Sequence, residues 1–155
     1  MNGKVDPSKI EDLFRNIDIY VGHLRQLAQL PRETFTEDPI KLGAAKYYLH
    51  VTIECCIDVA NHLIARLNLR PPESYADSFT VLAENDIINY DFAETASRMV
   101  KMRNRLVHLY WEVDEDIVYN VLQNNLDDFR TFQQQIANFI TKRSIGAEDI
   151  EASKA

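Results

Sequence analysis

The chain has 155 residues, 46% hydrophobic and 26% charged, which is the composition of one globular domain. It contains only four glycines and five prolines, which disfavours a many-turned β-sandwich or barrel and a glycine-rich phosphate loop. Its net charge is −7, so nucleic-acid binding would require a local basic patch.

The cysteines and the apolar segments indicate a cellular compartment. Cys55 and Cys56 are adjacent and are the only cysteines, which excludes a disulfide framework and is typical of a reducing cytoplasm. The first residues lack the apolar segment of a signal peptide. No apolar run approaches the roughly 18 residues that a membrane span requires. We therefore expect a cytoplasmic protein without membrane contact.

Helical periodicity covers most of the chain, because apolar residues recur at spacings of three and four. The first half predicts a helix over residues 6–30, a second over residues 38–69 and a short one over residues 77–83, capped by Asp77. An aspartate followed by a proline marks the start of each long helix, and prolines follow their ends.

Two further helices are predicted in the second half. One begins at Asp91 and the other at Asp114, where three acidic residues favour a helix start, and the latter ends near Gly146. Residues 147–155 form a short acidic tail that is predicted to be disordered. We therefore expect one all-α domain over residues 1–146, a bundle of about five helices with an antiparallel up-and-down core.

The stretch from residue 98 to residue 111 is the most unusual part of the chain. Four of its first eight residues are basic and none is acidic: Arg98, Lys101, Arg103 and Arg105. A charge run is usually a solvated helix face. Here, however, a guanidinium and the His108 imidazole are part of what acid–base cleavage of a phosphodiester needs. Tyr110 and Trp111 add aromatic faces on which an unstacked base can lie.

Helix geometry constrains how these groups can meet. Arg103 and His108 are five residues apart, about 140° around the axis of an unbroken helix. Three solutions remain open: Arg103 reaches around, the helix unwinds before His108, or a second subunit completes the site. A new helix start at Asp114, six residues later, makes unwinding plausible.

The motif resembles that of a known family. Arg103, Asn104 and His108 match the Arg-polar-x-x-x-His motif of the HEPN superfamily. With Tyr110 two residues after the histidine, the segment is similar to the HepT-like toxins, and the resemblance covers most of the chain. It implies a HEPN-type helical bundle and a metal-independent endoribonuclease toxin without a cofactor. It also implies a homodimer and a minimal nucleotidyltransferase antitoxin as partner.

The resemblance also implies roles for single residues. The RNA 2′-hydroxyl would attack the adjacent phosphorus, with Arg103 holding the phosphate and His108 moving protons. Asn104 would orient the phosphate or His108, and Tyr110 would be the tyrosine that the antitoxin adenylylates. The expected RNA-binding residues are Arg98, Lys101, Arg105 and Trp111.

Other interpretations stay open. The second predicted helix has four polar residues at intervals of four: His50, Glu54, Asp58 and His62. They could bind a metal, form a polar seam or pair Glu54 or Asp58 with Arg103; the missing second ligand-bearing helix disfavours metal. Three basic residues there read as ordinary surface charges: Lys41, Lys46 and Arg66. The alternative functions are a non-catalytic nucleotide- or RNA-binding subunit of a nucleotidyltransferase and a purely structural helical module.

Overall fold

The computed structural model describes residues 4–154, apart from the side chains of residues 147–150 and 154. Over these residues the chain is all-α, with seven α-helices, one 3-10 turn and no strand, as the sequence predicts. The elements are α1 (Pro7–Ala28), α2 (Arg32–Thr36), α3 (Pro39–Arg66), α4 (Tyr75–Glu84), α5 (Tyr90–His108), η1 (Tyr110–Glu112), α6 (Glu115–Asn124) and α7 (Asp127–Lys154).

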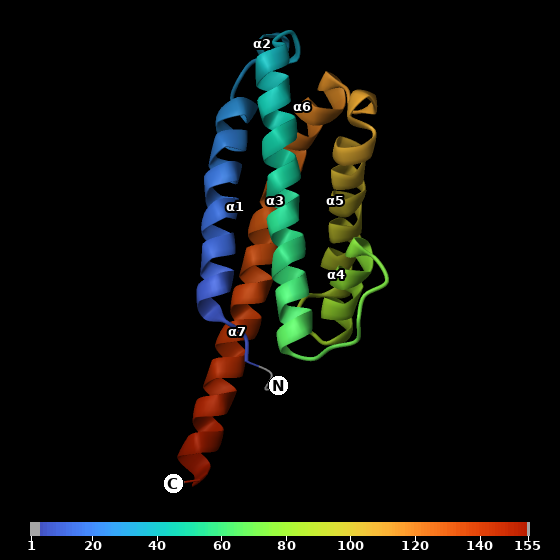
Figure 1. Cartoon of the computed structure of the whole chain (residues 1–155). Helices are drawn as coiled ribbons and strands as arrows, with labels where there is room; N and C mark the ends of the chain where they lie inside the picture. The colour runs from blue at the N-terminus through green and yellow to red at the C-terminus, as the bar shows by residue number, and fades with distance from the viewer. Residues whose placement is uncertain (1–3, 155) are drawn as a thin grey trace.

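The four longest helices form an up-and-down bundle (Figure 1). α1, α3, α5 and α7 alternate in direction, and α3 contacts α1, α4 and α5 as well as the short helices α2 and α6. α4 packs against α5 at one end of the bundle, and α6 lies near the other end. The antiparallel core is therefore confirmed, with α3 at its centre.

Aspartates start three of the helices, as their sequence positions indicate. The carboxylates of Asp6 and Asp38 accept hydrogen bonds from backbone N–H groups two and three residues further on, and a proline occupies the first turn. Asp114 accepts from the N–H of Ile117 in the same way. These predicted starts are confirmed.

Two other predicted caps are wrong by a few residues. Ser74, not Asp77, caps α4, and Asn89, not Asp91, caps α5. Both aspartates lie in the first helical turn instead, where a negative charge suits the helix dipole. Asp77 there accepts two hydrogen bonds from Arg70, at 2.8 and 2.9 Å, which fixes the loop before α4.

The core forms where the apolar faces of the long helices meet α4. Its largest fully buried side chains include Ile17, Leu24, Phe35, Leu49, Ile57, Leu63, Phe79, Leu82, Phe132 and Ile136. The ring of Phe132 lies 5.8 Å from that of Phe79 and 5.9 Å from that of Phe92, so α7 is joined to α4 and α5. Cys55 and Cys56 are buried free thiols whose pKa values are raised by burial, as inert core residues require.

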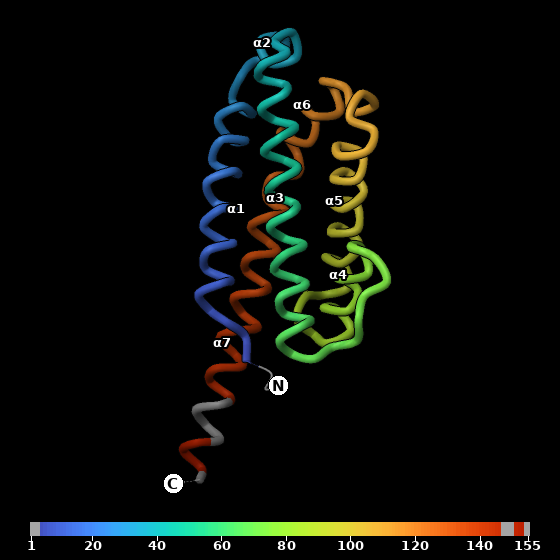
Figure 2. The backbone as a smooth tube through the Cα atoms, in the orientation of Figure 1, coloured from blue at the N-terminus to red at the C-terminus, as the bar shows by residue number. Residues whose placement is uncertain are grey.

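The continuous apolar periodicity after Asp114 hides a turn. The sequence predicts one helix to Gly146, but the chain forms two helices, α6 and α7, separated by a turn at Asn125. Figure 2 shows α6 near one end of the bundle and α7 running from there to the C-terminus. Both helices bury apolar side chains, so periodicity alone cannot reveal the interruption between them. The two acidic residues that open α7 were the local signal for a new helix.

Two further segments differ from the prediction. The stretch between the first two predicted helices, for which the sequence predicts no helix, contains α2, whose Phe35 is fully buried in the core. The backbone of α7 stays helical through Lys154, where the sequence predicts disorder from residue 147. No proline follows Gly146, and alanine and glutamate there favour a helix. None of the helices in residues 4–154 is long and apolar enough to cross a membrane.

Candidate functional site

Arg103 is held between two neighbouring helices. Its Nε donates a hydrogen bond to Oε1 of Glu54 on α3, and its side chain is only 14% exposed. Its Nη1 donates to Oδ1 of Asn104 at 3.0 Å, and its guanidinium lies 5.1 Å from the centre of the Tyr75 ring on α4. Oε1 of Glu54 also lies 3.2 Å from Nε2 of His50. The hypothesis that Glu54 pairs with Arg103 is confirmed.

His108 is the last residue of α5 and is exposed. The helix does not unwind before it, so that solution to the geometry is wrong; the backbone leaves the helix directly afterwards, at Leu109. Arg103 packs against α3, whereas His108 lies about 140° further around the same helix. No described residue hydrogen-bonds to the His108 ring. Within one chain the guanidinium of Arg103 therefore pairs with Glu54 and makes no hydrogen bond to His108 among the described residues.

Tyr110 begins the turn that follows α5. Its side chain is 48% exposed, and its backbone carbonyl accepts a hydrogen bond from Nζ of Lys46 at 3.1 Å. The same ammonium lies 4.0 Å from the centre of the Tyr110 ring. Burial lowers the pKa of Lys46, while the carboxylates of Glu115 and Asp114 act in the opposite direction. A buried lysine on α3 thus anchors the turn on which Tyr110 is displayed.

Sequence reasoning missed Lys46, and its interpretation as a surface charge is wrong, because the residue is only 6% exposed. The signal lies in its position: Lys46 is three residues before Leu49 and seven before Ile53, on the buried face of α3. A lysine on an apolar stripe must find a partner, and here that partner is the Tyr110 turn.

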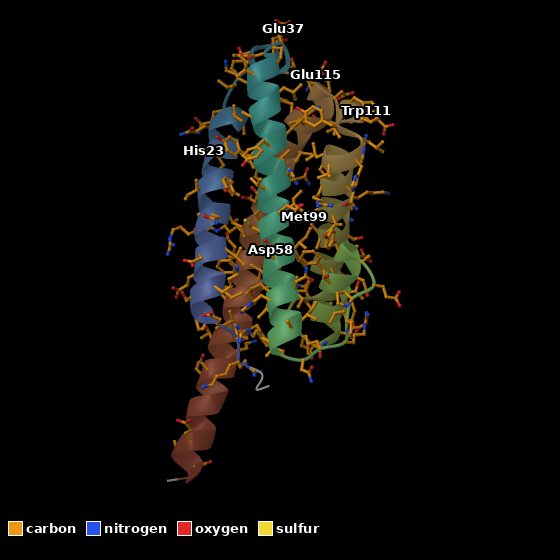
Figure 3. The ribbon with its side chains drawn as sticks, in the orientation of Figure 1. His23, Glu37, Asp58, Met99, Trp111 and Glu115 are labelled. Carbon is orange, nitrogen blue, oxygen red and sulfur yellow. The ribbon has the colours of Figure 1, made fainter. Side chains whose placement is uncertain are left out.

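The remaining residues of the basic stretch divide between two places. Arg105 donates to the carbonyl of Glu112 at 3.2 Å and so braces the turn, on which Trp111 is 75% exposed at the outer corner of the bundle (Figure 3). Lys101 is exposed on α5. Arg98 instead lines a pocket of about 220 Å³ toward α6 and α7. The stretch is therefore not one continuous patch.

The four polar residues spaced along α3, His50, Glu54, Asp58 and His62, do not act as one group. The first two, His50 and Glu54, contact each other and lead to Arg103. Asp58 is exposed, and Nε2 of His62 accepts a hydrogen bond from the backbone N–H of Asp6 at 3.2 Å, where α1 starts. In the part of the chain that the structure describes, no three His, Cys, Asp or Glu side chains are arranged to hold a metal ion.

Fold and site together define a class of protein. The chain is an all-α bundle with an arginine and a histidine near the end of one helix and a tyrosine in the turn that follows. The family model described as Ribonuclease HepT-like matches residues 17–136, and the chain belongs to that family. The resemblance drawn from the motif is confirmed.

Three relatives show how close the similarity is. The chain is 44% identical over 79 residues to the mRNA nuclease HepT of Shewanella oneidensis, a match that covers 51% of this chain and 59% of that protein. It is 21% identical over 136 residues to the tRNA nuclease HepT of Aphanizomenon flos-aquae, covering 88% and 92%. The solved structure of the tri-AMPylated Shewanella oneidensis HEPN toxin in complex with MNT antitoxin is 32% identical, covers 86% of this chain and 99% of that one, and has a TM-score of 0.80.

Proposed function

We propose that the protein is an endoribonuclease toxin that cleaves RNA without a metal ion and acts in the cytoplasm. The 2′-oxygen of a ribose forms a bond to the adjacent phosphorus as the bond to the 5′-oxygen breaks. The products are a 2′,3′-cyclic phosphate and a 5′-hydroxyl. The observation that carries this proposal is the fixed guanidinium of Arg103 on the same helix as the exposed imidazole of His108, in a chain of the HepT-like family.

Each motif residue has a part in this reaction. Arg103 binds the phosphate and stabilises the negative charge that develops on its oxygens. His108 takes the proton of the 2′-hydroxyl or, when protonated, gives a proton to the departing 5′-oxygen. Asn104, whose amide already contacts Arg103, keeps the guanidinium aimed at the phosphate. Lys101, Arg105 and the exposed Trp111 ring contact the flanking RNA, and Arg98 does so more weakly from its separate position.

The active form is proposed to be a homodimer. Within one chain Arg103 pairs with Glu54 of α3, and His108 lies about 140° further around α5, so a second copy would supply the partner group that one phosphate needs. A two-fold arrangement would place two motif copies opposite each other in one cleft.

Tyr110 is proposed to be the control point. A minimal nucleotidyltransferase antitoxin would catalyse attack of the Tyr110 phenol oxygen on the α-phosphorus of ATP. Pyrophosphate would leave, and AMP would stay bound to the tyrosine oxygen. The exposure of this side chain and the AMPylated relative in complex with its antitoxin support the proposal. The added phosphate would repel RNA phosphates two residues from His108.

The test is RNA digestion in excess EDTA, with the new ends identified by mass. Wild type is compared with Arg103→Ala and His108→Ala, and with Arg66→Ala and His23→Ala as matched controls elsewhere. Cyclic-phosphate ends from wild type and both controls, and none from the two motif variants, are expected. Well-folded, unmodified wild type that binds RNA but never cleaves it would instead favour the non-catalytic binding subunit.

A further inference from the structure

A pocket that the proposed chemistry does not use opens directly beside the motif. It has a volume of about 480 Å³, and its lining includes Asn104 of α5, Tyr75 of α4 and Asn61 of α3. This volume lies within the ~300–1,000 Å³ of typical small-molecule sites. Because Asn104 contacts Arg103, a group in this pocket would be a neighbour of the phosphate that Arg103 binds.

Tyr75 gives the pocket an aromatic wall in a fixed place. Its ring is 46% exposed and has the guanidinium of Arg103 5.1 Å from its centre. It is the first residue of α4, whose start is capped by Ser74 and whose preceding loop is tied to the helix by Arg70. A rigid, half-exposed ring is a stacking surface for a planar ligand.

The amide groups of the pocket are set to donate hydrogen bonds. Oδ1 of Asn61 accepts from the hydroxyl of Ser78 at 3.0 Å, and Oδ1 of Asn104 accepts from Arg103 at 3.0 Å. These bonds orient each amide, and neither NH2 group donates to a described residue, so both are available to donate to a ligand. Such donors suit a ligand with carbonyl oxygens.

The charge of the pocket favours an RNA base over an RNA phosphate as its ligand. Glu73 lies on its wall, and none of its lining residues is basic. A carboxylate repels a phosphate but accepts a hydrogen bond from the ring N–H of a base. Carbonyl oxygen next to ring N–H is the edge of uracil and guanine and is absent from cytosine and adenine.

We propose that the pocket between Tyr75 and Asn104 is a nucleobase subsite, which binds uracil or guanine on the nucleotide next to the cleaved linkage. The inference rests on the proposed ribonuclease function. The base stacks on Tyr75. Asn61 and Asn104 donate to the two carbonyl oxygens of uracil, or one of them donates to the single carbonyl oxygen of guanine, and Glu73 accepts a hydrogen bond from the ring N–H. The subsite thus sets the base preference of cleavage.

The first experiment compares wild type with Tyr75→Ala, Tyr75→Phe and Tyr90→Ala. Tyr90 is a matched control, because it is also the first residue of its helix and is 63% exposed. Substrates are short strands with a single ribonucleotide linkage. For Tyr75→Ala we expect KM to rise about tenfold, the loss of one base stack, and kcat to fall by less than that as the contact with Arg103 is lost. Tyr75→Phe keeps the aromatic ring and should restore the low KM, whereas Tyr90→Ala should match wild type. A fall in kcat with unchanged KM would show that Tyr75 only positions Arg103 and would overturn the subsite.

The second experiment tests base preference and separates binding from cleavage. Glu73→Ala, an exposed position, should lower the preference for uracil or guanine over adenine or cytosine at least threefold; an unchanged preference contradicts the assignment. Fluorescence anisotropy with the same strands carrying deoxyribose at the cleaved linkage measures affinity without chemistry. If wild type cleaves nothing, the ribonuclease proposal fails, while a tenfold affinity loss in Tyr75→Ala would still support the subsite. Equal affinities would reject it.

Discussion

The two halves of the motif differ in how firmly the fold holds them. Arg103 is only 14% exposed and contacts Glu54 of α3 and Tyr75 of α4. Trp111, eight residues later, is 75% exposed, and His108 has no hydrogen-bond partner among the described residues. A group that binds a phosphate benefits from being fixed in advance. Groups that a second copy or a modifying enzyme must reach have to stay accessible.

The largest effect is expected from the exposed half. His108→Ala should lower RNA cleavage at least about 100-fold, because a general acid–base group is lost. Its free energy of unfolding should stay within about 0.5 kcal/mol of wild type, because the side chain is exposed and makes no hydrogen bond to a described residue. Cleavage assays and urea unfolding check both expectations. A loss of stability as large as the loss of activity would contradict the division into two halves.

The fixed half can be loosened without removing its guanidinium. Glu54→Gln should lower kcat about tenfold, because a neutral amide holds Arg103 less firmly than a carboxylate does. Asp58→Asn removes an exposed carboxylate one turn further along α3 and serves as control. If the two variants cleave RNA equally fast, Glu54 does not orient Arg103.

Lys46 links the halves, since it anchors the Tyr110 turn to α3. Lys46→Met keeps an unbranched apolar stem but removes the ammonium, and with it both the hydrogen bond to the Tyr110 carbonyl and the contact with its ring. AMP incorporation by a cognate nucleotidyltransferase with ATP, followed by mass, should slow about fivefold as the turn loosens. Lys9→Met, at an exposed lysine of α1, should label normally. Tyr110→Phe defines the background of AMP incorporation. If Lys46→Met is labelled as fast as wild type, Lys46 does not hold the Tyr110 turn in place for the reaction.

The smallest effect concerns pH and a histidine outside both halves. Desolvation, with a contribution from Arg66, lowers the pKa of His62, whose neutral ring accepts from Asp6. When the pKa of a histidine is lower in the folded than in the unfolded chain, protonation favours unfolding. The contribution to the free energy of unfolding is therefore fully present above the pKa of the unfolded chain, about 6.5, and is lost as the pH falls below it. The loss should stay under about 0.5 kcal/mol after solvent screening. In His62→Gln the urea unfolding midpoint should change less between pH 7.5 and pH 5 than it does in wild type. An equal change in both proteins would exclude a contribution of His62 to the pH dependence of stability.

Much of the fold followed from local pattern. Proline after aspartate started α1 and α3, and spacings of three and four gave the long helices their buried faces. The same periodicity concealed the turn at Asn125, because both sides of a turn can bury apolar residues. It also concealed α2, which exists because Phe35 finds room in the core.

The sequence by itself determined the helical class, the order of the long helices and the motif that marks the family, because capping, periodicity and motif spacing are local properties. Only the tertiary structure decided that Glu54 and Tyr75 hold Arg103, that Lys46 is buried beneath Tyr110, and that a pocket opens beside Asn104. These relations join residues from different helices. They depend on how α3, α4 and α5 pack against one another, and the spacing of residues along the chain does not encode the distances between helices.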